Sequence, residues 1–433
     1  MERCSVDRDA LLGPGATLRR LMGLWPLQGS GAERLCSALL GGFSLLFIAC
    51  PVLSAGLKLY MDPPRKIEET ALSCFVAFIC SVMWIKVALF IGQRDTLLQL
   101  VDLLTVVRNL YNNGEGNEYT RRRYHRLIQR VYLFLQAAAV PALMGWVSSP
   151  LLSHSVHGGD HPSPDSKRQL PVSLWLPMEV HTSPTYEILY VAQSIGLTIA
   201  AESTVCIDIF FFHMMLVIGA ELEVLNENIS AVHKLRKETG KSKRRDYIYE
   251  YQATSETTML SCDDSYTAGL LEQRLQLQLV DNIQHHQTIL SSICLLQTTM
   301  SVSVFVLLFI NMANLCANIF VTAVLLQRDG NITKALKALL AIPPVLYETG
   351  MYCMFGHIVT GQSEKLMQSA FSCGWTECDV RFRRSVLIFM TTTVRPVEIT
   401  VGKMTKLSKQ TLLQVLNGTY ALLNLLYHFH SSV

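Results

Sequence analysis

The sequence predicts an all-α membrane protein with seven transmembrane helices, and three observations carry that prediction. Half of the 433 residues are hydrophobic and only 16% are charged, which is too apolar for an ordinary water-soluble chain. Seven runs are nearly free of charge and long enough, at about 1.5 Å per residue, to cross a hydrocarbon core of about 30 Å. Lysine and arginine gather in alternate connections between these runs.

The seven apolar runs follow one another along the whole chain, with no internal repeat and no strand-like alternation. In order they cover residues 35–60, 71–91, 127–149, 186–218, 289–326, 335–360 and 411–429. The fourth and fifth runs are longer than a bilayer requires. We therefore expect these two helices to protrude on one side of the membrane, where they can pack together.

The distribution of positive charge places the N-terminus inside and the C-terminus outside. The segments then predicted inside hold 26 lysines and arginines, against 6 in the segments predicted outside. The inside segments are 1–33, 92–126, 219–288 and 361–410, and the outside segments are 61–70, 150–185 and 327–335. Asn331 begins a glycosylation sequon in an outside segment, which agrees with this orientation.

The first 360 residues divide into two parts. Residues 1–34 form a cytoplasmic N-terminus, in which the amphipathic stretch 18–27 either lies as a short helix at the membrane surface or begins the first span. Residues 35–360 carry six transmembrane helices, with a ligand pocket expected in their outer half. The cytoplasmic loop 219–288 is long, and its polar stretch 241–265 is expected to be largely disordered.

The last part of the chain holds two segments of different character. Residues 361–410 are cationic and interrupted, as expected for a cytoplasmic anchor. Residues 411–433 comprise the seventh helix and a short extracellular tail. This helix contains Gln414, Asn417 and Asn424, and a spanning helix keeps such groups where they face protein or water. It is therefore expected to pack against copies of itself or to line an aqueous path.

Short motifs at both ends of the chain carry a family resemblance. In the last seventy residues they are GQSE at 361–364, AFS at 370–372, Trp375, RPVEITVGK at 395–403, LSK at 407–409 and TY at 419–420. Upstream lie LMGLWP at 21–26 and HQ at 286–287. Together these motifs resemble those of the insect odorant receptors, and the layout of the whole chain is similar to theirs.

The resemblance implies a ligand-gated, non-selective cation channel in which four subunits meet around a pore lined by the seventh helix. It implies a ligand-specific subunit that binds a volatile small molecule and joins the shared odorant co-receptor in a heterotetramer. Its expected place is among the lipids of the plasma membrane of olfactory sensory neurons. No catalytic residue, cofactor, metal or nucleic-acid partner is expected.

Three side chains of the seventh helix are candidates for the pore. Thr419, Leu423 and Leu426 follow one another at four and then three residues, so they share a helix face. Leu423 lies where the resemblance puts the hydrophobic gate, and a ring of apolar side chains closes a path by dewetting. The alternative is that these leucines pack helix against helix.

Candidate ligand contacts occupy the outer halves of four spans. Aromatic walls with few hydrogen-bonding groups suit a volatile, mostly apolar molecule, and small residues opposite a tryptophan leave room for it. The candidates are Phe75, Phe78 and Ile79 on the second span, Ala139, Ala142 and Trp146 on the third, Tyr190 and Gln193 on the fourth, and Tyr347, Glu348 and Met351 on the sixth. Ordinary helix packing is the alternative for each.

Four ionisable groups lie within or near the spans. Glu348 either touches a ligand or accepts a hydrogen bond, because a charge at depth in a membrane is a functional candidate. Glu202 and Asp208 are expected to face cytoplasmic water or an anchoring contact between helices. Lys86 is expected to reach the inner membrane surface along its aliphatic stem.

Three rival classes fit the sequence less well. A G-protein-coupled receptor would carry an Asp/Glu-Arg-Tyr motif after the third span and Asn-Pro-x-x-Tyr in the seventh, and both motifs are absent from the sequence. A gustatory receptor of the same superfamily usually ends with Thr-Tyr followed five residues later by Gln-Phe, whereas Leu426 and Tyr427 stand there. A transporter or membrane enzyme would show repeated halves or an acidic relay.

Overall fold

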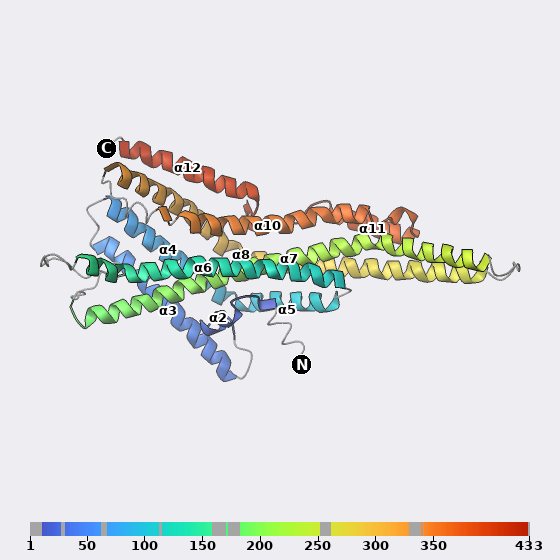
Figure 1. The fold of residues 1–433 in the computed structure, drawn as a ribbon, viewed down its shortest axis with the longest axis horizontal. Coiled ribbons are helices and arrows are strands. Elements are labelled where there is room, and N and C mark those ends of the chain that lie inside the picture. The colour runs from blue at the N-terminus through green and yellow to red at the C-terminus, as the bar shows by residue number, and fades with distance from the viewer. Residues whose placement is uncertain are drawn as a thin grey trace.

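The chain folds into an elongated bundle of long helices, described here by a computed structural model (Figure 1). The structure describes residues 11–26, 31–61, 67–111, 115–157, 170–171, 182–251, 261–328, 339–340 and 342–431. The sequon at Asn331 lies outside the described residues.

Each of the seven predicted spans overlaps a helix. These helices are α3 (Gly31–Met61), α4 (Ile67–Gly92), α6 (Glu115–His157), α7 (Thr185–Tyr251), α8 (Ser261–Arg328), α10 (Ile342–Phe371) and α12 (Lys409–Ser431). By length and composition, four helices of the described chain are able to cross a membrane. The number is five if α4 and α5 (Arg94–Leu110), which meet at a bend of 64°, count as one broken span. The count of seven spans stays a prediction.

The two longest helices extend far beyond the rest of the bundle. α7 has 67 residues and α8 has 68, which at about 1.5 Å per residue is roughly three times the thickness of a hydrocarbon core. Their far ends lie side by side at the right of Figure 1. The stretch 241–265 was expected to be disordered, but α7 continues to its end at Tyr251 and α8 begins at Ser261. A helix that is already nucleated extends through polar residues at little cost.

The N-terminal segment packs against the bundle, and the position of its short helix at the membrane surface stays a prediction. It contains α2 (Ala16–Leu21), and the side chains of Arg19 and Trp25 are at most 2% exposed. The Arg19 guanidinium donates to the carbonyl oxygen of Leu12 and, at 3.1 Å, to that of Cys206 on α7. Burial lowers the pKa of Arg19 to about 10, so the group stays charged at neutral pH. These bonds explain why the segment lies against protein.

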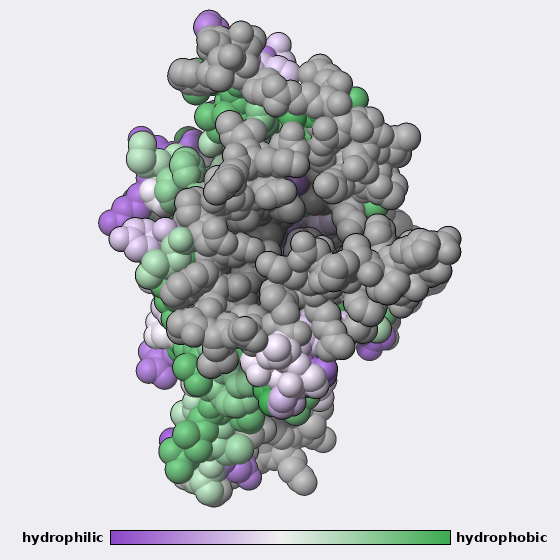
Figure 2. Space-filling model, turned by 90° about the vertical axis from the view of Figure 1, so that its left-hand side faces the viewer, coloured by the Kyte–Doolittle hydropathy of each residue, from purple (hydrophilic) through white to green (hydrophobic). Residues whose placement is uncertain are grey.

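The outer surface of α3 carries an apolar stripe. Figure 2 views the molecule from the left of Figure 1, and hydrophobic side chains gather low in that view, at the height of α3. The exposed members at helical spacing are Leu35, Leu39, Phe43, Leu46 and Leu53, each at least half exposed. A continuous apolar surface of this kind suits contact with lipid chains.

The predicted anchor segment is a chain of short elements laid against α8 and α10. They are η1 (Trp375–Glu377), α11 (Val380–Thr393) and the antiparallel strands β1 (Thr400–Val401) and β2 (Thr405–Lys406). At the turn between the strands, the Gly402 amide donates to the Ser301 hydroxyl on α8 at 2.9 Å. A Cβ at Gly402 would lie 2.4 Å from the Phe305 ring, so the hairpin approaches α8 as closely as glycine allows. The hairpin leads directly into α12.

The approach of α10 to the start of α12 depends on Gly356. A Cβ at this position would lie 2.4 Å from the Leu407 Cβ and 2.7 Å from its carbonyl oxygen. We expect Gly356→Ala to lower the free energy of unfolding by about 1–3 kcal/mol, because these atoms must separate. Gly350→Ala, in the same helix with no atom within 4 Å of its Cβ, is the matched control. Thermal midpoints in detergent would measure both, and equal midpoints would contradict this account.

Candidate functional site

An ionic cluster lies buried where four long helices meet. The Lys86 ammonium on α4 contacts the Asp208 carboxylate on α7 and lies 3.0 Å from Glu348 Oε1 on α10. The Tyr352 hydroxyl donates to Asp208, and the Asn311 amide on α8 donates to Glu348 Oε2 at 3.4 Å. The Lys86 side chain is only 2% exposed. In a medium of low dielectric constant such a cation is tolerated only when it is paired in this way.

This cluster corrects one prediction and bears on two others. Lys86 does not reach the membrane surface. Asp208 faces the bundle interior and joins α7 to α4, which fits the inter-helix alternative and not cytoplasmic water. Glu348 accepts a hydrogen bond from Lys86 on another helix, and its contact with a ligand stays a prediction. Glu202, one turn and a half before Asp208, accepts a hydrogen bond from Gln136 on α6 at 2.9 Å. The sequence carried a signal for this cluster, because Lys86, Asp208 and Glu348 are opposite charges isolated within apolar spans.

The aromatic candidates at the outer end bond to backbone, Tyr190 from α7 to α6 and Trp146 from α6 to the connection that follows it. The Tyr190 hydroxyl donates to the Val147 carbonyl oxygen at 2.6 Å, and the Trp146 indole N–H donates to the Pro171 carbonyl oxygen at 3.1 Å. The rings of Tyr190 and Tyr186 lie 6.0 Å apart. The polar atoms of both candidates are therefore satisfied by backbone, which leaves ring surface as what they can offer a ligand.

The side chains of the remaining ligand candidates differ in how far they are exposed. The Tyr347 ring on α10 lies 5.0 Å from that of Phe134 on α6, and Met351, one turn on, packs against the core. Gln193 is buried, and Ile79 and Ala139 are half-buried. Phe78 is 55% exposed and Ala142 is also exposed, so the structure does not bring these two together with the others. Phe75 lies on α4, and its side chain is outside the described part.

The two faces of α12 differ in what they contact. Thr419 is 4% exposed and donates to the Val415 carbonyl oxygen at 2.9 Å. A Cβ at Gly418 would lie 2.6 Å from the Met312 sulfur, so this face packs closely on α8. Thr419 is thus packed within the chain, and its part in the pore stays a prediction. Leu423 is half-buried, and Leu426 is 38% exposed.

The opposite face of α12 carries an exposed stripe that the sequence analysis did not single out. It consists of Leu413, Asn417, Tyr420 and Asn424, spaced at four, three and four residues. Helical periodicity alone defines several such stripes on α12. Only the contacts with α8 show which of them faces away from the rest of the chain.

A second buried ion pair lies nearer the anchor. The Arg121 guanidinium on α6 binds the Glu221 carboxylate on α7 through two hydrogen bonds, each of 2.8 Å, and both side chains are at most 4% exposed. His285 Nε2 on α8 lies 3.3 Å from Glu221, and the Tyr111 ring stacks on His285 at 4.2 Å. Of the run of arginines at 121–123, only Arg121 is buried. This pair ties α6, α7 and α8 together below the first cluster.

Long apolar helices, a lipid-suited surface and buried ion pairs define a membrane protein built as a helical bundle. The family model described as 7tm Odorant receptor matches residues 66–420, which is most of the chain. This protein therefore belongs to the 7tm odorant receptor family.

Individual relatives agree with this assignment over nearly the whole length. Odorant receptor Or1 of Anopheles gambiae is 22% identical over 423 residues, covering 95% of this chain and 94% of its own. Odorant receptor 42a of Drosophila melanogaster is 22% identical over 83% of this chain and 75% of its own length. The structure of the insect olfactory receptor OR5 from Machilis hrabei in complex with eugenol superposes with a TM-score of 0.72. It covers 99% of this chain and 98% of its own at 15% identity, which establishes a shared fold.

The buried cluster around Lys86 predicts that two substitutions lower the stability by different amounts. Lys86→Met would leave Asp208 and Glu348 buried together without a cation, and we expect a loss of about 3–5 kcal/mol in the free energy of unfolding. Asp208→Asn leaves the lysine paired with Glu348, so its loss should be smaller. Thermal midpoints of the purified variants in detergent give the comparison. A larger loss for Asp208→Asn would show that Lys86 is not the central partner.

Proposed function

We propose that this protein is the ligand-specific subunit of a ligand-gated, non-selective cation channel that it forms with the shared odorant co-receptor. The observation that carries the proposal is the family match across residues 66–420. In this proposal the chain crosses the plasma membrane of olfactory sensory neurons seven times, with its N-terminus inside and its C-terminus outside. The positive charges of the segments 92–126 and 361–410 support that orientation.

The ligand in this proposal is a small, mostly apolar organic molecule bound between α4, α6, α7 and α10. A related olfactory receptor, OR5 from Machilis hrabei, has been solved in complex with eugenol, which supports a ligand of this class. The polar atoms of Trp146 and Tyr190 are bound to backbone, so these residues offer a ligand their rings. Recognition would then rest on shape and dispersion, with few hydrogen bonds to reject close analogues.

The ionic cluster offers a route from ligand to gate. Tyr347 precedes Glu348, whose carboxylate is tied to Lys86 and to Asn311 on α8. α8 is also the helix on which α12 packs. A ligand that binds the open arrangement of these helices more tightly than the closed one shifts the equilibrium towards opening, whereas equal affinity for both would open nothing.

The pore in this proposal lies along the face of α12 that turns away from α8. Its stripe combines polar Asn417 and Asn424 with Leu413 and Tyr420. Leu423 lies at the edge of this face, and Leu426 lies on the Thr419 side of α12, where it is 38% exposed. These two leucines are the proposed hydrophobic gate. A small rotation of α12 would bring their side chains into or out of the path and so control its wetting.

Whole-cell current separates this function from its rivals. Expressed with the co-receptor, the chain should give a fast inward cation current to one or a few volatile compounds, and this current should persist when G proteins are blocked. Tyr347→Ala should raise the half-maximal concentration of an activating compound about tenfold or more, because it removes the half-buried ring proposed to contact the ligand. Phe78→Ala, on an exposed position of α4, is the control. Slow currents that vanish on G-protein block would exclude the channel.

Cysteine accessibility tests the face of α12. In channels that carry current, Asn424→Cys should be modified by a membrane-impermeant, positively charged thiol reagent, with a change in current within seconds. Thr419→Cys should be protected, because Thr419 is 4% exposed and packed towards α8. The channel without either cysteine provides the baseline. Rapid modification at residue 419 together with protection at 424 would reverse the assignment.

A further inference from the structure

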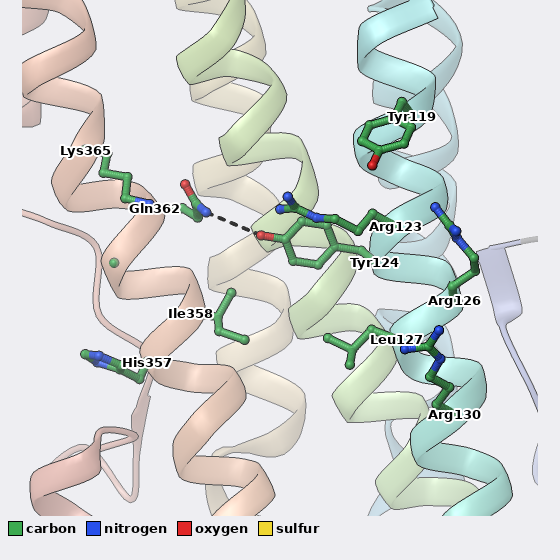
Figure 3. A pocket seen from close by; sticks show the side chains of 11 residues that line it. Tyr119, Arg123, Tyr124, Arg126, Leu127, Arg130, His357, Ile358, Gln362 and Lys365 are labelled. Carbon is green, nitrogen blue, oxygen red and sulfur yellow. Dashed lines mark hydrogen bonds between the residues drawn. The ribbon is translucent and has the colours of Figure 1, made fainter.

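A cationic groove lies between α6 and α10, on the side of the bundle nearer the anchor segment (Figure 3). Its volume is about 640 Å³. Arg123, Arg126 and Arg130 project from the α6 wall, and Lys365 projects from the α10 wall (Figure 3). None of the residues that line it is acidic. Neither the ligand pocket nor the pore proposed above uses this groove.

The depth of the groove follows from the charge pattern of α6. Arg130 is the last charged residue before an uncharged stretch that covers 131–150. Twenty helical residues span about 30 Å, which is the thickness of the hydrocarbon core. When that stretch fills the core, Arg126 and Arg130 lie at its boundary, level with lipid headgroups.

Among the residues that the structure describes, three of the four cations have no acidic partner. Arg123 donates to both Glu223 oxygens, at 2.7 and 2.8 Å, so its charge is compensated. Arg126 donates only to the Arg122 carbonyl oxygen, at 3.4 Å. Within the described part of the chain, no carboxylate lies at salt-bridge distance from Arg126, Arg130 or Lys365. Like charges gathered in a hollow favour an anion that enters it.

The floor and the ends of the groove are apolar or small. Leu127 and Ile358 face it from opposite walls. On α7 below, a Cβ at Gly219 would lie 3.3 Å from Ile358 and 3.8 Å from the Tyr124 ring, so α7 closes the floor. A Cβ at Gly361 would meet no atom within 4 Å, which leaves open space along the α10 wall. The groove therefore joins a cationic rim to an apolar wall.

We propose that this groove binds the headgroup of an anionic, phosphate-bearing membrane lipid, whose acyl chains lie along Leu127 and Ile358. Arginine binds phosphate oxygens through two parallel hydrogen bonds, and lysine adds a further point charge. A soluble phosphate would match the cations but would leave the apolar wall bare. The position at the membrane boundary and the amphipathic lining favour the lipid. Occupied, the groove would clamp α6 to α10, which carry ligand candidates at their outer ends.

Binding of a short-chain fluorescent phosphoinositide to the purified full chain in detergent tests this assignment. The wild type should show saturable anisotropy that short-chain phosphatidylcholine does not displace. Arg126→Gln with Arg130→Gln should weaken binding at least tenfold, since each arginine near an anionic surface contributes about fivefold. Gly361→Phe should weaken it without any change in charge, because the ring enters the open space. Arg122→Gln is the matched control, on an exposed arginine outside the groove.

Each alternative to lipid binding predicts a different result in this experiment. Equal weakening by Arg122→Gln would mean unspecific attraction and would overturn the site. Full displacement by inorganic phosphate or by the free inositol phosphate headgroup at matching concentration would assign the groove to a soluble anion and overturn the lipid. No saturable binding to wild-type protein that elutes as a single species would also overturn the proposal. Elution profiles identify misfolded variants, and Gly361→Phe provides a test that leaves the arginines in place.

Discussion

A single buried lysine sets the arrangement of the helices around it. Removing an ammonium group from water costs several kcal/mol, so Lys86 is stable inside the bundle only if carboxylates reach it. Asp208 and Glu348 come from two other helices, α7 and α10, and Asn311 adds α8. These contacts bring α4, α7, α8 and α10 together at one level, and the candidate ligand residues lie on three of those four helices.

Buried ion pairs lie at two levels along the length of the molecule. Between the Lys86 cluster and the Arg121–Glu221 pair lies the most buried part of α7, including Phe210, Phe211 and Phe212. Charged groups at both levels are satisfied by specific partners, whereas the layer between them is filled by aromatic packing. α7 and α8 thus take part in polar contacts at two heights, on either side of this packed layer. That property suits the proposed transmission from ligand to α12.

Much of the fold was predictable from the chain, and less of the site. Charge-free runs located seven helices, because their apolar side chains and helical backbone are local properties. The side chains of Tyr190 and Tyr347 occur in interhelical contacts, whereas Trp146 is 46% exposed and bonds to the connection at Pro171. The exposure of Phe78 and the burial of Thr419 were not predictable in this way. Periodicity says which residues share a helix face, but it does not say which neighbour that face meets.

The sequence by itself determined that the chain is helical and which stretches form the helices, since a backbone in hydrocarbon must satisfy its own hydrogen bonds. It also determined the family, through short motifs whose residue types are unusual together. Tertiary structure alone decided that the N-terminal segment is buried, that Lys86 turns inward, and that Arg126 and Arg130 face a groove while Arg121 does not. The reason is physical: burial and pairing of a side chain depend on helices hundreds of residues apart, whose approach no local pattern encodes.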